Sequence, residues 1–128
     1  MIPAPDNITH LEKNEIFVFG SNTAGRHGKG AALIAQRKFG ALNGAGMGRT
    51  GQCYAIATKD RNLSVLRTWE ISVQVDRFIR YAVAHPELTF LVTRVGCGLA
   101  HYNAKDIAPM FKGSPENVRL PSDWLSFV

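Results

Sequence analysis

Residues 16–32 read IFVFGSNTAGRHGKGAA, and this stretch decides the fold. Four apolar residues typical of a strand run into GSN, and a loop with glycines at positions 25, 28 and 30 leads into a helix-forming segment. In α/β proteins this succession often holds phosphate, because glycine lets a ligand approach the backbone amides and a helix N-terminus stabilises an anion. The spacing matches neither the dinucleotide fingerprint nor the P-loop. On these residues alone, a phosphate site and a purely structural turn are equal interpretations.

Size and composition indicate one soluble domain over residues 1–128, because this length suffices for a single core. No apolar run approaches a membrane span, and MIPAPDNITH lacks the regions of a signal peptide. Cys53 and Cys97 stand in no metal or redox spacing, so we expect a cytoplasmic protein without metal or cofactor. The net charge of +5 favours an anionic partner, but scattered basic residues suit a small ligand as well as a nucleic acid.

Strand-like and helical patterns alternate along the chain, which predicts an α/β three-layer domain with a mixed sheet. We expect strands at 16–19, 54–57, 89–92 and 118–120, and helices at 30–39, 71–85 and 104–111. The first helix should turn Ala31, Leu33, Ile34 and Phe39 towards a core. Residues 1–14 should lie on the surface, 15–112 form the main body, and 113–128 form a C-terminal extension. Residues 41–51, ALNGAGMGRTG, are either a flexible connection or a loop shaped by a ligand.

Unusual residues follow three predicted strands, at 20–30, 58–60 and 94–102. In an open α/β sheet such loops meet at one edge and form the ligand crevice. Two glycine loops that each lead into a helix suit the two phosphates of a diphosphate. The predicted ligand-binding residues are Gly20, Ser21, Asn22, Gly25, Gly28, Lys29, Gly30, Ala31, Thr58, Asp60, Arg94, Gly96, Cys97, Gly98, Leu99 and Tyr102. The candidate catalytic residues are Lys59, Asn22 and His27.

Five motifs follow one another in register over about residues 15–112. They are His27-Gly28-Lys29-Gly30-Ala31, Lys38-Phe39-Gly40, Gly51-Gln52, Thr58-Lys59 and Arg94-Val95-Gly96-Cys97-Gly98-Leu99. Together they resemble a macrodomain, the ADP-ribose-binding α/β module, and in particular the branch of terminal ADP-ribose glycohydrolases and antitoxins that remove ADP-ribose from DNA bases. Residues 20–28, GSNTAGRHG, also resemble small bacterial and phage macro-like proteins.

The resemblance implies a macrodomain-like fold and a monomer or small oligomer that binds ADP-ribose or a related nucleotide, free or attached to a protein or nucleic acid. In a hydrolase of this branch, Lys59 would attack the ribose C1″. The chain departs from this branch at two places, one that bears on hydrolysis and one that bears on adenine recognition. The assisting aspartate after Gly-Cys-Gly-Leu is Ala100 here, and no aspartate that would read adenine precedes Ile16. A hydrolase, a non-catalytic binding module and a basic nucleic-acid-binding domain therefore stand as alternatives.

The polar candidates each have a structural interpretation beside the functional one. Asn22 either faces the ligand or closes an Asx-turn. His27 is either an acid or base, or a hydrogen-bonding loop residue. Lys59 acts as a nucleophile or phosphate contact, or it pairs with Asp60. Arg94 pairs with phosphate or with a structural carboxylate.

Three further candidates depend on how the loops fold. Tyr102 either stacks on a base or ribose, or belongs to the core. Cys97 lies between glycines and should be exposed, but no motif ties a base to it. Asp60 could replace the missing aspartate only if the chain folds so that its carboxylate faces the crevice.

Overall fold

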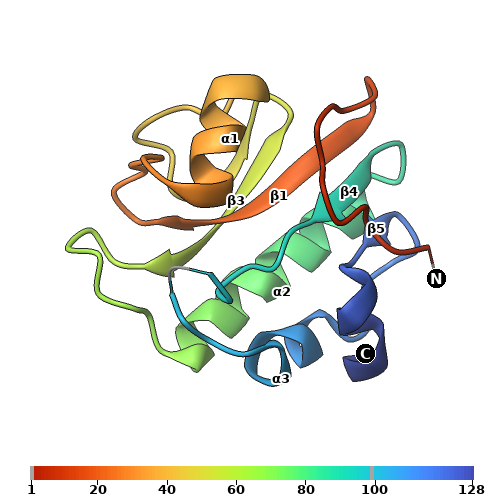
Figure 1. Cartoon of the computed structure of the whole chain (residues 1–128). Helices are drawn as coiled ribbons and strands as arrows, with labels where there is room; N and C mark the ends of the chain where they lie inside the picture. The colour runs from red at the N-terminus through yellow and green to blue at the C-terminus, as the bar shows by residue number, and fades with distance from the viewer. Residues whose placement is uncertain (1, 99) are drawn as a thin grey trace.

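In a computed structural model of the chain, which describes residues 2–98 and 100–128, helices cover both faces of a central sheet (Figure 1). The elements are β1 (Glu15–Asn22), α1 (Gly30–Lys38), β2 (Gly48–Thr50), β3 (Cys53–Lys59), α2 (Thr68–Ala84), β4 (Thr89–Val92), α3 (Ala104–Ile107), the 3-10 helix η1 (Ala108–Phe111), β5 (Val118–Arg119) and the 3-10 helix η2 (Ser122–Phe127). The predicted α/β fold with a mixed sheet is therefore confirmed. Within the described ranges, no helix has the length and apolar character needed to cross a membrane.

The sheet has β1 at its centre, in the order β2-β3-β1-β4-β5. β1 runs parallel to β3 and β4, β5 runs parallel to β4, and only β2 is antiparallel to its neighbour β3. The middle of β1 and nearly all of β3 are buried, as expected for strands covered on both faces. This topology brings the carboxyl ends of β1, β3 and β4 to one edge of the sheet, and those of β1 and β3 lie on the left of Figure 1.

β1 and β2 differ most from the sequence prediction, whereas β3 and β5 differ from it only at their ends. β1 extends beyond residue 19 because Gly20 and Ser21 pair in register with Ile56 and Ala57, so the first glycine loop starts later than expected. β2 was not predicted at all. Its three residues lie within a glycine-rich segment without hydrophobic alternation, and their pairing with β3 supplies the order that their own sequence lacks.

α1 packs on the sheet through small residues, and the prediction for its buried face was partly wrong. Ala32 and Ala35 are buried, whereas Ile34 is 41% exposed. Phe39, directly after the helix, does face inward and packs its ring 5.0 Å from that of Phe17. The alanines permit close approach of the helix to β1, which holds the N-terminus of α1 near the sheet edge.

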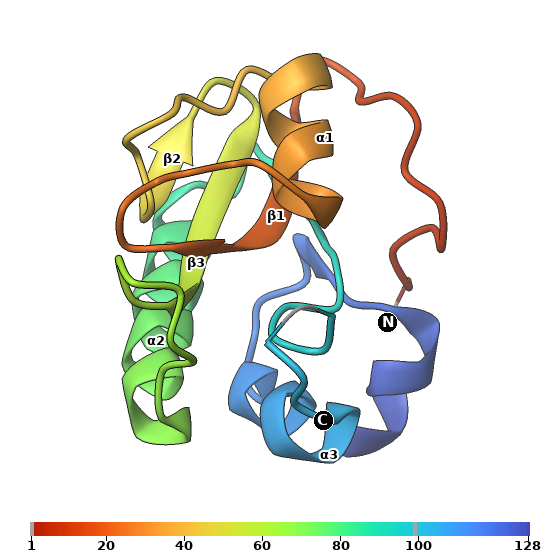
Figure 2. The same ribbon diagram turned by 60° about the vertical axis from the view of Figure 1, so that its left-hand side comes forward.

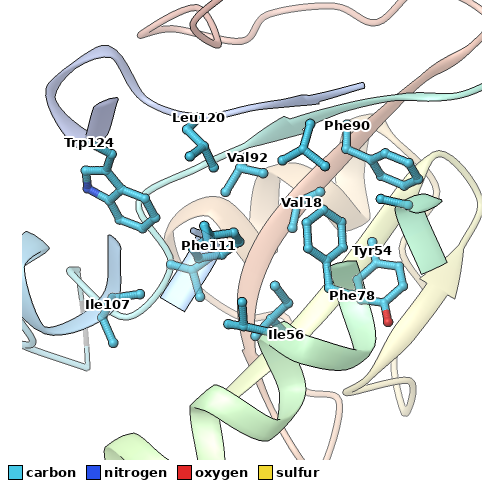
Figure 3. Close-up of a cluster of buried hydrophobic side chains, with 14 of the residues drawn as sticks. Val18, Tyr54, Ile56, Phe78, Phe90, Val92, Ile107, Phe111, Leu120 and Trp124 are labelled. Atoms are coloured by element: carbon cyan, nitrogen blue, oxygen red, sulfur yellow. The ribbon is translucent and has the colours of Figure 1, made fainter. Parts of the chain in front are cut away.

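The larger core lies between the sheet and the layer of α2, α3, η1 and η2 (Figure 3). Phe78 of α2 is fully buried, and its ring lies edge-on to those of Tyr54 and Phe90 at 5.1 and 5.3 Å. Trp124 is also fully buried, with its ring 5.6 Å from that of Phe111. Residues of the predicted C-terminal extension therefore complete the core.

The N-terminal segment runs along the outside of the domain towards the C-terminal residues (Figure 2). Most of residues 2–14 are exposed or half-buried, as expected for a surface segment, but Ala4 is buried. The Ala4 N–H donates to the carbonyl oxygen of Leu120 at 2.7 Å, and Ala4 forms a parallel bridge with Pro121. This contact fixes the two ends of the described chain beside each other.

Candidate functional site

A cavity of about 660 Å³ opens at the carboxyl ends of β1, β3 and β4. It is lined by these predicted site residues: Gly20, Ser21, Asn22, Gly28, Lys29, Gly30, Ala31, Thr58, Lys59, Arg94, Gly96, Cys97 and Gly98. The two glycine loops thus meet at one cavity, although some 65 residues separate Gly30 from Gly96 in the sequence. Leu99, which was also predicted, lies outside the described residues.

The N-terminus of α1 forms one wall of the cavity. The first hydrogen bond of the helix joins the Leu33 N–H to the Lys29 carbonyl oxygen at 3.3 Å. The N–H groups of Gly30, Ala31 and Ala32 consequently have no partner within the helix, and no side chain caps it. Because these amides and the helix dipole favour negative charge, the wall is suited to an anion.

The charged residues of the lining are all cationic. Arg26, Lys29, Lys59 and Arg94 line the cavity, and among the residues that the structure describes no aspartate or glutamate does so. In residues 2–98 and 100–128 no carboxylate forms an ion pair with Arg26, Lys29 or Lys59. The field inside the cavity therefore attracts anions.

Arg94 differs from the other three cations because it is paired. Its guanidinium lies 2.7 Å from a carboxylate oxygen of Asp123 and 3.5 Å from one of Asp6. The hydrogen bonds and charge of Asp123 raise the pKa of Arg94, and the guanidinium in turn lowers the pKa of Asp123. The interpretation of Arg94 as the partner of a structural carboxylate is thus the one that the contacts favour.

Asn22 lines the cavity but uses its amide within the loop. Its Nδ2 donates to the Arg26 carbonyl oxygen at 2.8 Å, and its Oδ1 accepts from the Arg26 N–H at 3.1 Å. Both groups close the turn that places Arg26 at the cavity. This geometry matches the predicted turn-forming role and leaves the amide poorly placed to orient a water molecule.

His27 does not line this cavity. The imidazole is buried, lies edge-on to Phe19 with ring centres 5.3 Å apart, and has its Nε2 2.9 Å from the Leu42 carbonyl oxygen. It borders a smaller hollow of about 310 Å³, whose lining shares Arg26 and Gly28 with the large cavity. The structure therefore separates His27 from Lys59, and its contacts are those of the hydrogen-bonding loop residue.

Residues 41–47 pack against the back of the first glycine loop. The Gly44 N–H donates to the Gly25 carbonyl oxygen at 2.8 Å, and the Ser21 hydroxyl donates to the carbonyl oxygen of Gly46. The two loops approach so closely that a Cβ built on Gly25 would lie 2.3 Å from the carbonyl carbon of Gly44. Gly25 therefore serves loop packing and does not line the large cavity. Residues 41–47 thus pack on the first glycine loop and help to hold it in place, so they are not a flexible connection.

Asp60 and Tyr102 were predicted to contact ligand, but neither lines the cavity. The Asp60 carboxylate accepts the N–H groups of Asn62 and Ser64 at 2.8 and 3.0 Å, so it stabilises its own turn. The Tyr102 hydroxyl donates to the Leu66 carbonyl oxygen at 2.5 Å, and its ring packs against the larger core. Asp60 is consequently not placed to supply a carboxylate to the cavity, whereas the buried Ala100 does line it.

Cys97 lines the cavity but is a weak nucleophile. Burial raises the pKa of its thiol, and the charge of Asp106 raises it further. The thiol is thus protonated at neutral pH, and the thiolate is the reactive form. This geometry gives no support to covalent chemistry at Cys97.

Several lining residues were not among the predicted site residues: Arg26, Ala32, Leu63, Thr93, Val95 and Ala100. A sequence signal existed for Arg26, inside the glycine loop, and for Thr93, directly after a predicted strand. Leu63 had none, because an isolated leucine in a polar loop carries no motif.

Comparison of the chain with protein-family models, with curated proteins and with solved structures finds no match.

Proposed function

We propose that this protein binds ADP-ribose or a related nucleotide through its diphosphate, which the backbone amides of the two glycine loops hold. One observation carries the proposal: both loops, the uncapped N-terminus of α1 and three unpaired cations line a single cavity. A diphosphate matches these groups in charge and in hydrogen bonding, since amides and cations only donate. The volume is also within the usual 300–1,000 Å³ of small-molecule sites.

A binding module is the form of this proposal that the lining favours. Glycosidic hydrolysis commonly uses an acid and a base, which carboxylates or imidazoles supply. Within the described residues the lining holds neither, because Asp60 and His27 lie elsewhere and Ala100 stands at the position of the family aspartate. We therefore propose that this protein binds the ligand of the macrodomains it resembles and does not hydrolyse it.

Calorimetric titration with ADP-ribose, AMP, NAD and cyclic ADP-ribose tests the proposal. We expect micromolar or tighter binding of ADP-ribose and weaker binding of AMP, which lacks the second phosphate. Gly28→Leu and Gly98→Leu should abolish binding without unfolding the protein. Both glycines line the cavity, neither has positive φ, and a Cβ at either meets no atom within 4 Å.

Matched charge variants test whether the cations act inside the cavity. Lys29→Gln should weaken ADP-ribose binding about tenfold, since a hydrogen bond to a charged group contributes roughly 1.5–3 kcal/mol. Lys112→Gln removes the same charge at an exposed position that does not line the cavity, and should leave the affinity unchanged. Equal losses in both variants would indicate a general effect of net charge, and steep salt dependence would then favour nucleic-acid binding.

Hydrolysis is the second candidate, and the position of Lys59 favours it. Lys59 lines the cavity, and its amine pairs with no carboxylate among the described residues. As a nucleophile it would form a bond to the ribose C1″ while the modified protein or nucleic acid leaves, and water would then release ADP-ribose. Release of ADP-ribose that is lost in Lys59→Ala would establish this activity. Release that persists in Lys59→Ala would exclude the lysine as nucleophile.

A further inference from the structure

Leu63 combines two features that a surface turn does not need. It is a non-glycine residue with φ +63°, in the left-handed region, and it lines the cavity while 52% exposed. A bulky residue in this conformation is strained, whereas glycine or asparagine adopts it readily. About half of the leucine is exposed, so it gains only part of the free energy that full burial of its side chain would provide.

The turn that carries Leu63 is held firmly. Lys59 and Val65 form an antiparallel bridge, and the Leu66 N–H donates to the Thr58 carbonyl oxygen at 2.8 Å. Between them, the Leu63 N–H donates to the Asp60 carbonyl oxygen at 3.0 Å, and the Asp60 carboxylate accepts two further N–H groups. This network fixes Leu63 in the lining of the cavity. Strain of this kind gathers at ligand contacts, where the surrounding structure maintains it.

The uncharged polar side chains of the lining give a second, independent observation. Each donates to the backbone: Ser21 to Gly46, Asn22 to Arg26, Thr58 to Ser21 and Thr93 to Val18. The remaining polar side chains of the described lining are the cations and the protonated thiol of Cys97. The lining thus offers donors for phosphate but no carboxylate for the edge of a nucleobase, and its neutral polar side chains are already tied to the backbone.

We infer that Leu63 is a ligand-contacting residue that holds the heterocyclic base of the nucleotide by its apolar face, and that the site therefore tolerates different bases. The inference rests on the proposed function, because it takes the diphosphate to lie against the glycine loops. An apolar contact covers the face of a purine or pyrimidine without distinguishing the hydrogen-bonding groups on its edge. It also supplies base recognition in a chain without the early adenine-reading aspartate.

The test measures binding of ADP, GDP, UDP and inorganic pyrophosphate to the full chain and to Leu63→Asn. Asparagine accepts the left-handed conformation but lacks the apolar side chain. We expect ADP and GDP to bind within about threefold of each other. Leu63→Asn should weaken ADP about fivefold, as expected from the exposed half of a leucine, and leave pyrophosphate unchanged. Its Tm should rise by about 2–5 °C because strain is relieved.

Val83→Asn is the matched control, because Val83 is 61% exposed on α2 and does not line the cavity. Val83→Asn should change neither the affinity for ADP nor the affinity for pyrophosphate. Unchanged ADP affinity in Leu63→Asn, or binding of ADP more than about tenfold tighter than GDP, would overturn the role of Leu63 and leave the proposed function standing. Binding of pyrophosphate alone would overturn base recognition and leave an anion site. A protein that binds none of the four would overturn both proposals.

Discussion

Gly46→Ala should destabilise the protein by adding a single methyl group to the segment that supports the first glycine loop. Gly46 does not have positive φ, so the backbone conformation itself admits alanine. The neighbours do not. A Cβ at this position would lie 2.0 Å from the carbonyl oxygen of Asn22 and 3.0 Å from the Cα of Thr23. Both atoms belong to the backbone of β1 and the loop after it, so no side chain can rotate away.

The structure gives the size of the effect. The methyl group must move more than about 1 Å to reach ordinary van der Waals contact, and overpacking of this kind typically costs 1–3 kcal/mol. The displacement also breaks the hydrogen bond from the buried Ser21 hydroxyl to the Gly46 carbonyl oxygen, at about 1–3 kcal/mol for an unpaired buried group. Because the unfolded chain loses entropy when glycine becomes alanine, about 0.4–1 kcal/mol is recovered. We expect a net loss of about 2–4 kcal/mol.

Urea denaturation of Gly46→Ala and Gly28→Ala measures this difference. The two variants make the same chemical change in adjoining loops, but a Cβ at Gly28 meets no atom within 4 Å. Gly28→Ala should therefore be neutral or slightly more stable than the parent protein. Equal unfolding free energies for the two variants would refute the close packing of residues 41–47 on the first loop.

Two further perturbations test the C-terminal part of the fold. Trp124→Ala should lower the free energy of unfolding by about 3–5 kcal/mol, because the indole is fully buried, while Phe127→Ala, at a 37% exposed residue, should cost much less. A small loss for Trp124→Ala in urea denaturation would contradict its place in the core. Asp123→Asn tests pH dependence. Since Arg94 lowers the pKa of Asp123 below its ordinary 3.8, the carboxylate contributes stability above that pH and loses it as the pH falls through the lower folded pKa. The stability gap between parent and variant should thus be below about 1 kcal/mol at neutral pH, as for an exposed pair, and should close in acid.

The sequence predicted the parts of the site that depend on backbone pattern. Hydrophobic runs placed β1, β3 and β4, and glycine clusters after two of them indicated where loops meet, because parallel strands carry their carboxyl ends to one edge. The residues of these loops that line the cavity through backbone, such as Gly28 and Gly98, were found for this reason.

Side-chain partners were less predictable, because they come from segments distant in sequence. His27 contacts Leu42, and Arg94 pairs with Asp123, and no local pattern announces either contact. Leu63 was missed for a different reason. It has a positive φ, which leucine rarely adopts, and residue propensities predict only the common conformations of each residue type.

The outermost strands of the sheet bear on how the protein avoids aggregation. β2 has three residues and β5 has two, and each contains an arginine. Short, charged edge strands are poor templates for pairing with a strand of another molecule. Just after β5, Pro121 is already bridged to Ala4, which limits further pairing at that edge. The long apolar strands β1 and β3, which would be aggregation-prone if exposed, are interior in the sheet order. Variants that lengthen β2 with β-branched residues should accordingly bring self-association before they bring any loss of fold.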